Sequence, residues 1–314
     1  MVPSTVMFDL GQVVLRWVPE RAFEQVMDAA EVPAFMERVE FHPWNKENDR
    51  FDDLAQNEAA WIARFPSDAV GMQAFRTYFD HTVTEMVPGT SAIMAELQQA
   101  GVPISALSNW SGELFTRTRA RWGILNRFSD IVVSGREGVV KPDRRIFELA
   151  CERNNVNPAE VVFIDDTAEN VEAAINFGMQ ALQFTSAERL RADLVELGLL
   201  RARVPLTQPI YHWAPREVWR EALAAGHYPW SARGRGYIEE GFVHFSFADQ
   251  LLATREKFYA DLSTPELVLL RWDPSPMTPV VVENGYPHLF APLPLDEVSE
   301  VSVDALDLYG EVRQ

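Results

Sequence analysis

Short apolar segments alternate with helix-forming segments through the first two-thirds of this 314-residue chain, and this alternation limits the possible folds more than any other feature. The segments expected to form strands are Val6–Phe8, Val102–Leu107, Asp130–Ser134, Val161–Ile164 and Ala181–Phe184. Helical patterns lie between them, at Gly89–Ala100, Arg144–Arg153 and Thr167–Phe177. Such alternation predicts an α/β fold in which helices cover both faces of a doubly wound parallel sheet. Ligands of these sheets bind at the carboxyl ends of the strands.

Two interruptions of this alternation predict the domain organisation. Residues 17–86 contain no good strand but several amphipathic helical stretches, such as Arg21–Ala30, Asn57–Arg64 and Ala69–Phe79. They predict a helical cap inserted after the first strand. A Pro-containing stretch near residues 201–209 then separates a leucine-rich helix from a region of irregularly alternating strands and helices. We therefore expect a first domain at 1–203 (core 1–16 and 87–203, cap 17–86), a linker at 204–208 and a small α+β domain at 209–314.

The overall charge excludes some classes of partner. The chain has 28 Lys and Arg against 46 Asp and Glu, which gives a formal net charge of −18. We therefore expect neither nucleic acid nor an anionic membrane surface as a partner. The single cysteine, Cys151, excludes an intrachain disulfide, and its apolar neighbours predict a buried thiol. Without a long apolar stretch or a secretory leader, the sequence favours a cytoplasmic protein.

Chemically useful side chains stand at the ends of the predicted strands or at the start of the following helix. In chain order they are Asp9, Ser108, Asn109, Lys141, Asp165 and Asp166. Because the carboxyl ends of parallel strands share one edge of a sheet, four separate loops would bring these groups together. Each element alone is common in turns and helix starts, so the prediction depends on their combination and order.

This set fits phosphoryl transfer to a carboxylate. Asp9 could attack phosphorus if Mg²⁺, held by Asp9, Asp166 and a backbone carbonyl, screened the negative charges. Lys141 would add a second positive charge, and Ser108 with the amide of Asn109 could hold the phosphoryl oxygens. The expected intermediate is an aspartyl phosphate that water then hydrolyses.

The segments FDLGQVV, LSNW, GVVKPDRRIF and FIDDTAENVEAAINFGM resemble the four motifs of the haloacid dehalogenase superfamily. The resemblance spans roughly residues 1–200 and is closest to the sugar-phosphatase-like branch, which includes α-glucose-1-phosphate phosphatases. It implies that Asp9 is the nucleophile, that Ser108 and Asn109 bind phosphate and that Lys141 is the charge partner. It also implies that Asp165 and Asp166 hold Mg²⁺, with Asn170 in a supporting position.

The resemblance further implies a helical cap that closes over a small phosphorylated metabolite, which we expect to be a sugar phosphate. Phe41 to Asn45 form a polar and aromatic cluster in a segment that Pro43 is expected to break. The cluster could contact a sugar ring, although helix packing is the commoner role for any one of its residues. The carbonyl of Gly11 is the predicted backbone ligand of Mg²⁺.

Gly11 is also where the sequence departs from the usual phosphatase motif, which has a second Asp two residues after the nucleophile. That Asp acts as a general acid and base, a role commonly worth about 10²–10⁴-fold in rate. Either the leaving group needs little protonation, as an anomeric hydroxyl would, or turnover is weak. A catalytically idle first domain in a nucleotide-binding or regulatory protein is the alternative function.

The 2-haloacid dehalogenases also lack the second Asp and use no metal, so they are a further alternative. Their last motif has Ser or Asn types in place of the paired acids. Asp165 and Asp166 would put two unneutralised carboxylates beside Asp9, which is costly without a cation. The sequence therefore favours a phosphatase.

The final hundred residues are rich in histidine. His212 lies on an apolar strand, and alternation places His244 and Ser246 on one face of another. Glu283 ends a strand and precedes His288 by five positions. Three histidines and a glutamate allow a zinc site, but the spacings typical of zinc enzymes are missing, and structural histidines are the more common outcome.

The segments IYHWA, GFVHFS and YPHLF, with Glu283, resemble the domain-of-unknown-function 952 family. That family has been grouped with ADP-ribosyltransferase-like folds, which grip a dinucleotide with a His, a hydroxyl or aromatic residue and often a Glu. The resemblance implies that His212, Ser246 and Glu283 fill those places. It leads to the hypothesis that residues 208–314 bind NAD or an ADP-ribose-like nucleotide.

Overall fold

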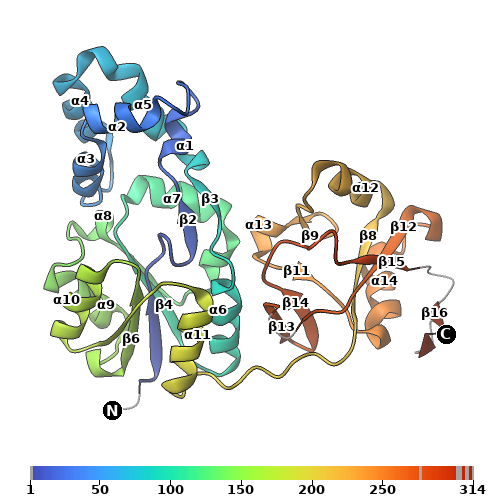
Figure 1. Ribbon diagram of the computed structural model, residues 1–314. Helices are drawn as coiled ribbons and strands as arrows, with labels where there is room; N and C mark the ends of the chain where they lie inside the picture. The colour runs from blue at the N-terminus through green and yellow to red at the C-terminus, as the bar shows by residue number, and fades with distance from the viewer. Residues whose placement is uncertain (1–2, 276–277, 302–305, 308–310, 313–314) are drawn as a thin grey trace. The chain divides into compact units, whose positions relative to one another are not determined.

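The computed structural model describes residues 3–275, 278–301, 306–307 and 311–312. The described residues form two compact units (Figure 1). The first unit comprises those up to residue 90, together with 100–121 and 125–200. The second comprises 91–99, 122–124 and those from residue 201 onward.

Five parallel strands form the sheet of the first unit, in the order β5-β4-β1-β6-β7. Their bounds are Thr5–Phe8 (β1), Ile104–Ser108 (β4), Ile131–Val133 (β5), Val161–Asp165 (β6) and Gln180–Gln183 (β7). Every residue of β1, β4, β5 and β6 is buried, as expected for strands covered on both faces. The predicted doubly wound parallel sheet is confirmed, and the strand ends differ from the predicted ends by one or two residues.

Helices follow the strands as the alternation predicts. Their bounds are Thr90–Gln99 (α6), Gly112–Arg121 (α7), Ser134–Glu137 (α8), Arg144–Asn154 (α9), Ala168–Phe177 (α10) and Ala187–Glu196 (α11). Helix α9 packs on one face of the sheet, where Phe147 lies against Phe163 of β6 with ring centroids 5.6 Å apart. Cys151 is buried in the same cluster, as expected, and burial raises the pKa of its thiol to about 11.

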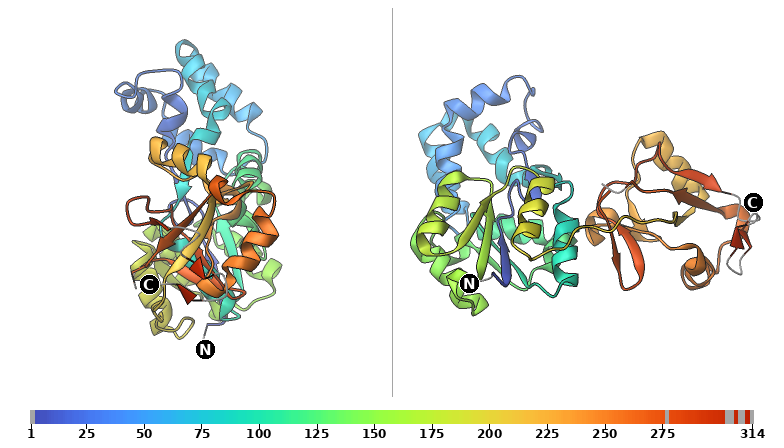
Figure 2. Two further views of the ribbon diagram at one scale, coloured as in Figure 1. Left: turned by 90° about the vertical axis from the view of Figure 1, so that its right-hand side faces the viewer. Right: turned by 60° about the horizontal axis from the view of Figure 1, so that its bottom comes forward.

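The segment between β1 and α6 forms a short β-ribbon and a group of helices beyond the carboxyl edge of the sheet (Figure 1 and Figure 2). The bounds are Leu15–Trp17 (β2), Glu20–Phe23 (α1), Val32–Arg38 (α2), Phe41–Asn48 (α3), Ala55–Arg64 (α4), Ala69–Thr77 (α5) and Val83–Met86 (β3). Strands β2 and β3 pair antiparallel and carry the chain out of the core and back.

Three local predictions in this segment were wrong. Strand β3 lies within residues 17–86, which were expected to contain no good strand. The helix expected at Arg21–Ala30 ends at Phe23, and the Asp28 carboxylate accepts the N–H of Ala30 in a turn that competes with helix formation. The segment around Pro43, expected to be broken, is instead helix α3. Pro43 lies in the first turn of that helix, where its missing N–H would have no intrahelical partner.

The second unit contains two three-stranded sheets, in the orders β15-β12-β8 and β11-β14-β13. Its strands are Ile210–Pro215 (β8), Trp230–Ala232 (β9), Arg235–Gly236 (β10), Val243–His244 (β11), Leu267–Trp272 (β12), Val280–Glu283 (β13), Tyr286–Leu289 (β14), Ser299–Val301 (β15), Leu306–Asp307 (β16) and Glu311–Val312 (β17). Its remaining helices are Arg216–Ala225 (α12), Tyr237–Glu240 (α13) and Leu251–Tyr259 (α14). An antiparallel bridge between Tyr211 and Ser246 links the two sheets.

Both faces of β8 and β12 are buried, so an apolar cluster lies on each side of their sheet. Val268 and Leu270 pack with Trp219 of α12 on one face, and Leu267 and Leu269 pack with Tyr259 of α14 on the other. Helices on both sides of an antiparallel sheet match the predicted small α+β region. Within the described part of the chain, no helix is long and apolar enough to cross a membrane.

Candidate active site

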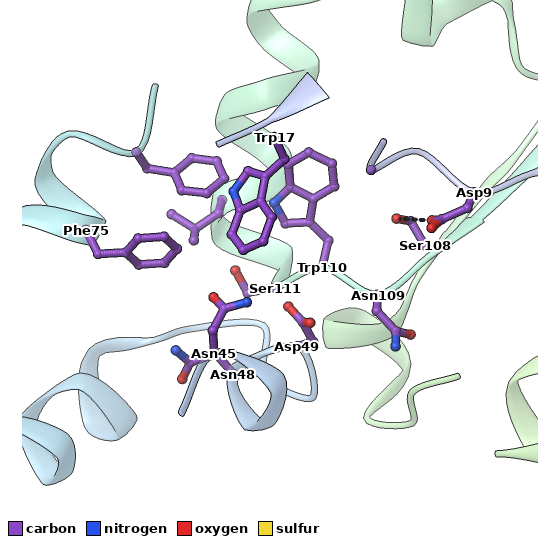
Figure 3. Close-up of a pocket in the computed structure, with 13 residues that line it drawn as sticks. Asp9, Trp17, Asn45, Asn48, Asp49, Phe75, Ser108, Asn109, Trp110 and Ser111 are labelled. Carbon is purple, nitrogen blue, oxygen red and sulfur yellow. Dashed lines mark hydrogen bonds between the residues drawn. The ribbon is translucent and has the colours of Figure 1, made fainter. Parts of the chain in front are cut away.

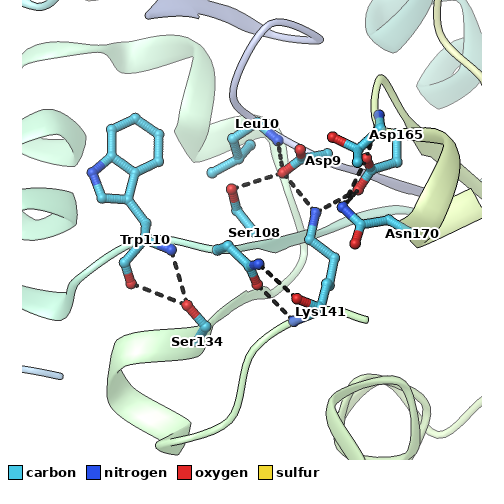
Figure 4. A network of polar contacts seen from close by, with 10 residues as sticks. Asp9, Leu10, Ser108, Trp110, Ser134, Lys141, Asp165 and Asn170 are labelled. Carbon is cyan, nitrogen blue, oxygen red and sulfur yellow. Dashed lines mark hydrogen bonds and ion pairs between the residues drawn. The ribbon is translucent and has the colours of Figure 1, made fainter. Parts of the chain in front are cut away.

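The polar residues predicted from the strand ends meet at the carboxyl edge of the parallel sheet (Figure 4). Asp9 follows β1, Ser108 is the last residue of β4, and Asp165 is the last residue of β6. Lys141 reaches the same place from the loop before α9. The strands are central in the sheet, so the side chains that leave their ends are buried and held close together.

Three donors hold one oxygen of Asp9 and leave the other free. The Ser108 hydroxyl donates to Oδ1 over 2.8 Å, and the backbone N–H of Leu10 donates to the same atom over 2.7 Å. The Lys141 ammonium lies 3.0 Å from Oδ1. Among the residues that the structure describes, none donates to Oδ2 of Asp9. The carboxylate is therefore fixed in orientation while Oδ2 remains available for attack or metal binding.

Asp165 is fully buried and uses its oxygens to hold the cluster together. Lys141 Nζ donates to Oδ2 over 2.6 Å, and the backbone N–H of Thr167 donates to Oδ1 over 2.8 Å. Asn170 Nδ2 contacts both oxygens, at 3.0 and 3.1 Å. This places Asn170 behind Asp165, and it makes Asp165 the group that orients Lys141 toward Asp9.

Charge and burial oppose each other in this cluster. Burial raises the pKa of Asp9 to about 6, although the Lys141 charge works in the opposite direction. Burial and the neighbouring Asp165 charge raise the pKa of Asp166. Burial alone would lower the pKa of Lys141, but the charges of Asp9 and Asp165 outweigh it and raise that pKa. The cluster thus holds three carboxylates around one ammonium group.

The donor set fits a hard divalent cation. Carboxylate oxygens of Asp9, Asp165 and Asp166 lie within 4.8 Å of one another, and this is the one such group among the described residues. Because Asp165 is already saturated with donors, the free oxygens belong to Asp9 and Asp166. The carbonyl of Gly11 accepts no backbone hydrogen bond from the described residues. Oxygen ligands of this kind suit Mg²⁺.

Asn109, which follows Ser108, and Gly11, which lies two residues after Asp9, have different surroundings. The side chain of Asn109 is occupied, since Nδ2 donates to the carbonyl of Lys141 over 3.0 Å and Oδ1 accepts the N–H of Lys141 over 2.8 Å. It therefore fixes the loop that carries Lys141. Gly11 faces open space, and a Cβ built there would meet no atom within 4 Å.

A cavity of about 100 Å³ lies between this cluster and the cap (Figure 3). Asp9, Gly11, Ser108 and Asn109 line it from the core. The remaining lining residues are Trp17, Asn45, Asn48, Asp49, Phe75, Phe79, Trp110, Ser111 and Leu114. Aromatic rings and short polar side chains therefore share the cavity with the nucleophile.

Sequence reasoning missed most of these cap residues. Of the predicted Phe41–Asn45 cluster, Asn45 lines the cavity, whereas Trp44 is buried inside the cap and stacks on Trp61 with ring centroids 3.9 Å apart. Asn48 and Asp49 lie in a charged stretch that is typical of a solvated helix face. Burial raises the pKa of Asp49 to about 7, and the Asp9 charge adds to this effect.

Backbone contacts hold the Asp49 loop against the core. The Ser134 hydroxyl donates to the carbonyl of Asp49 over 2.5 Å, and the N–H of Gly112 donates to the carbonyl of Phe51 over 3.2 Å. The N–H of Glu113 donates to the carbonyl of Asp52 over 2.8 Å. Gly135 permits this approach, because a Cβ there would lie 2.4 Å from the carbonyl oxygen of Phe51.

The five histidine-region candidates line one pocket of about 320 Å³ in the second unit. They are His212, His244, Ser246, Glu283 and His288. Arg233, Arg235 and Lys257 line it as well, together with the aromatic residues Tyr259 and Tyr286. The structure thus brings all five predicted residues together, although they come from β8, β13, β14 and the segment 244–246.

Two of these histidines are already paired. His212 Nδ1 contacts the carbonyl of His244 at 2.6 Å, and its Nε2 contacts the Tyr228 hydroxyl at 2.8 Å. Burial lowers the pKa of His212 to about 4, so the ring is neutral at physiological pH. His288 Nδ1 lies 2.9 Å from Glu283 Oε2. The described residues of this pocket form no metal-binding group, which leaves the zinc interpretation without support.

The comparisons with known proteins identify the family of the first unit. Residues 5–178 match the family model of the haloacid dehalogenase-like hydrolases. This is more than half of the chain, which therefore belongs to that family. Residues 213–301 match a second family, a protein family of unknown function designated DUF952.

Individual relatives match only part of this chain. Acyl-CoA dehydrogenase family member 10 of Mus musculus is 30% identical over 134 residues, which are 41% of this chain and 12% of that protein. Sesquiterpene phosphatase astK of Aspergillus oryzae is 31% identical over 34% of this chain and 55% of its own length. (S)-2-haloacid dehalogenase 4A of Burkholderia cepacia is 31% identical over 31% of this chain and 42% of its own length. The matched part of this chain thus spans between 12% and 55% of the length of these three proteins.

Among solved structures, a HAD family enzyme from Bacteroides thetaiotaomicron has a TM-score of 0.48 at 15% identity. The match covers 62% of this chain and 99% of that one.

Proposed function

We propose that the first unit is a Mg²⁺-dependent phosphohydrolase that acts on a small phosphorylated metabolite through an aspartyl-phosphate intermediate. The observation that carries the proposal is the Asp9 carboxylate, whose Oδ1 is held by Ser108, Leu10 and Lys141 while Oδ2 is free. Family membership supports hydrolysis, and a phosphatase among the relatives supports a phosphate ester as the substrate.

The reaction follows from these contacts. An oxygen of Asp9 attacks phosphorus, a new O–P bond forms, and the bond between phosphorus and the ester oxygen breaks. The leaving oxygen departs with the bonding electrons and takes a proton from water. A second water molecule then attacks the phosphorus of the Asp9 phosphate, which releases inorganic phosphate and restores the carboxylate.

Several residues of the cluster prepare this reaction electrostatically. Lys141, held by Asp165, lowers the repulsion between Asp9 and the phosphoryl group. Ser108 can turn from Asp9 to a phosphoryl oxygen. Asp9, Asp166 and the Gly11 carbonyl would hold Mg²⁺, and Asp165 would contribute through Lys141. When bound, the cation supplies further charge neutralisation at the transferred group.

Gly11 supports a sugar phosphate as the substrate class. No side chain at position 11 can protonate the leaving oxygen, so esters with a weakly basic leaving group are favoured, and anomeric sugar phosphates belong to that group. The small cavity above Asp9 also favours a compact leaving group over a large one. A feeble or idle first unit is the alternative, and intact contacts around Asp9 argue against it.

Dehalogenation is less well supported, although a 2-haloacid dehalogenase is among the relatives. Halide displacement by Asp9 would leave Asp166 as an uncompensated carboxylate beside the nucleophile. A metal-dependent phosphatase accounts for that charge. Release of halide from a 2-haloacid, without Mg²⁺ and faster than any phosphate release, would reverse this preference.

The first test is phosphate release from anomeric sugar phosphates, primary-alcohol phosphates and nucleotides, with and without Mg²⁺. We expect Mg²⁺-dependent release that is fastest for anomeric esters. The variant Asp9→Asn should lose at least about 10³-fold in kcat while its thermal unfolding stays close to that of the wild type. Full activity in Asp9→Asn would refute the nucleophile, and no release from any ester would refute the phosphatase.

The pocket of the second unit supports a second proposal, that it binds a nucleotide such as NAD or ADP-ribose. Arg233, Arg235 and Lys257 offer positive charge for phosphates, and Tyr259 and Tyr286 offer aromatic surface. His212 would shape the pocket rather than contact the ligand, because both of its ring nitrogens are engaged. Titration calorimetry of the full chain with NAD and ADP-ribose tests this, and the absence of heat at millimolar ligand would contradict it.

A further inference from the structure

Two buried polar atoms in the cavity above Asp9 have no hydrogen-bond partner. They are Nδ2 of Asn48 and Oγ of Ser111, and each of these residues is only 1% exposed. A buried polar group without a partner costs about 1–3 kcal/mol, so such atoms are rare unless something else satisfies them. Both residues line the cavity that contains the nucleophile. Their unmet hydrogen bonds therefore belong to the wall of the cavity in which a substrate would lie.

A third group in the same cavity is the carboxylate of Asp49. Among the described residues it accepts no hydrogen bond and forms no ion pair, although Ser134 fixes the Asp49 backbone through its carbonyl. In Figure 3 the Asp49 carboxylate lies near Asn45, between that residue and Asn109. Because the Asp49 backbone is fixed and its carboxylate is free, the carboxylate is suited to accept hydrogen bonds from a ligand.

The other wall of the cavity is aromatic. Trp17, Phe75, Phe79 and Trp110 line it. The Phe79 ring lies edge-to-face against Phe75 and Trp110, with ring centroids 5.6 and 6.1 Å apart. Aromatic faces pack well against carbon–hydrogen surfaces, while amide, hydroxyl and carboxylate groups bind hydroxyl groups. A molecule with hydroxyl groups on a compact carbon skeleton would satisfy both walls.

We infer that Asn48, Asp49 and Ser111 form a subsite that binds hydroxyl groups of the leaving alcohol, so that the preferred substrates are phosphate esters of polyhydroxylated alcohols. This inference rests on the proposed phosphatase function and deepens it. Asn48 donates through Nδ2, Asp49 accepts, and Ser111 does either. The aromatic wall holds the carbon skeleton while the phosphate faces Asp9.

Two matched pairs of esters test the subsite. Glycerol 1-phosphate and propyl phosphate differ only in hydroxyl groups, and α-glucose 1-phosphate and cyclohexyl phosphate share a six-membered ring. The variants are Ser111→Ala and Asp49→Asn. We expect each to lower kcat/KM for at least one hydroxylated ester by about 10- to 100-fold. For its partner without hydroxyl groups, the change should stay within about threefold.

Ser91→Ala is the matched control, because Ser91 also has a buried hydroxyl without a partner but does not line the cavity. Both serine variants should be at least as stable as the wild type, since each removes an unsatisfied buried group. Only Ser111→Ala should change the preference between paired esters. Equal losses for both members of each pair, or no loss for any hydroxylated ester, would overturn the subsite.

A binding experiment separates failure of the subsite from failure of the proposed function. Asp9→Asn, which is expected not to turn over, is titrated with each ester of the two pairs in the calorimeter. Tighter binding of the hydroxylated member, lost on adding Ser111→Ala or Asp49→Asn, supports the subsite even if the wild type releases no phosphate. Equal binding of paired esters overturns the subsite even if the wild type is an active phosphatase.

Discussion

The two pockets of the molecule differ in how many of their polar atoms already have partners. In the first unit, three donors hold one oxygen of Asp9 while its other oxygen is free. In the second unit, both ring nitrogens of His212 are hydrogen-bonded. Both pockets are lined by titratable groups. The first leaves carboxylate oxygens and polar atoms unsatisfied, which suits a group that must react. The second pairs His212 and His288 internally, which suits a pocket that keeps its shape around a ligand.

Among the substitutions that test this difference between the two pockets, Lys141→Met should have the largest effect on activity. The variant removes the ammonium that touches both Asp9 and Asp165, so the carboxylates repel the phosphoryl group more strongly. We expect kcat at saturating Mg²⁺ to fall by about 10²–10⁴-fold. Lys46→Met, at an exposed position of α3, serves as the control and should keep the wild-type kcat. Near-normal turnover in Lys141→Met would remove the electrostatic role assigned to this residue.

The next largest effect should be that of Asp49 on the pH dependence of folding stability. Its pKa is about 7 in the folded protein and about 3.8 when unperturbed, so the folded state holds the proton more tightly. Stability from this group is therefore lost as the pH rises from about 4 to 7. Without Mg²⁺, Asp49→Asn should stabilise the protein by about 1–4 kcal/mol at alkaline pH and leave it unchanged at acidic pH. Chemical denaturation across this range measures the difference, and a pH-independent effect would contradict it.

The contribution of His212 to folding stability should depend on pH in the opposite direction and should be smaller. Burial depresses its pKa from 6.5 to about 4, so the unfolded chain binds the proton more readily between these values. Stability of the second unit should therefore decline by about 1–3 kcal/mol as the pH falls through this window. His212→Gln should flatten that decline, as followed by hydrogen exchange of β8 and β12. An unchanged slope in the variant would assign the acid sensitivity to another group.

The sequence predicts the cluster around Asp9 well, because its members other than Lys141 lie at or just after the end of a buried apolar strand. Asp9, Ser108 and Asp165 lie at the strand ends, and the parallel sheet alone determines that they meet. The cap side of the cavity could not be predicted in this way. Asn48 and Asp49 lie among charged residues, and their burial depends on how α3 and its following loop dock on the core.

The second unit shows a different limit of sequence reasoning. Strand alternation identifies His212, His244 and Ser246 as candidates, and the structure brings them to one pocket. Whether His212 is available to a ligand depends on Tyr228, which lies after α12 and contacts the ring only because that helix packs on β8. The pattern along a strand carries no information about such a partner.

The attachment of the Asp49 loop to the core has a consequence for engineering. The loop is held through its backbone carbonyls, by Ser134, Gly112 and Glu113, whereas the Asn48 side chain accepts a hydrogen bond from Asn57 of α4 and so helps to fix the cap. Positions 45 and 49 can therefore be randomised together in a library without loss of the loop's anchorage. Selection from such a library would be expected to change which alcohol is accepted while the loop keeps its place on the core.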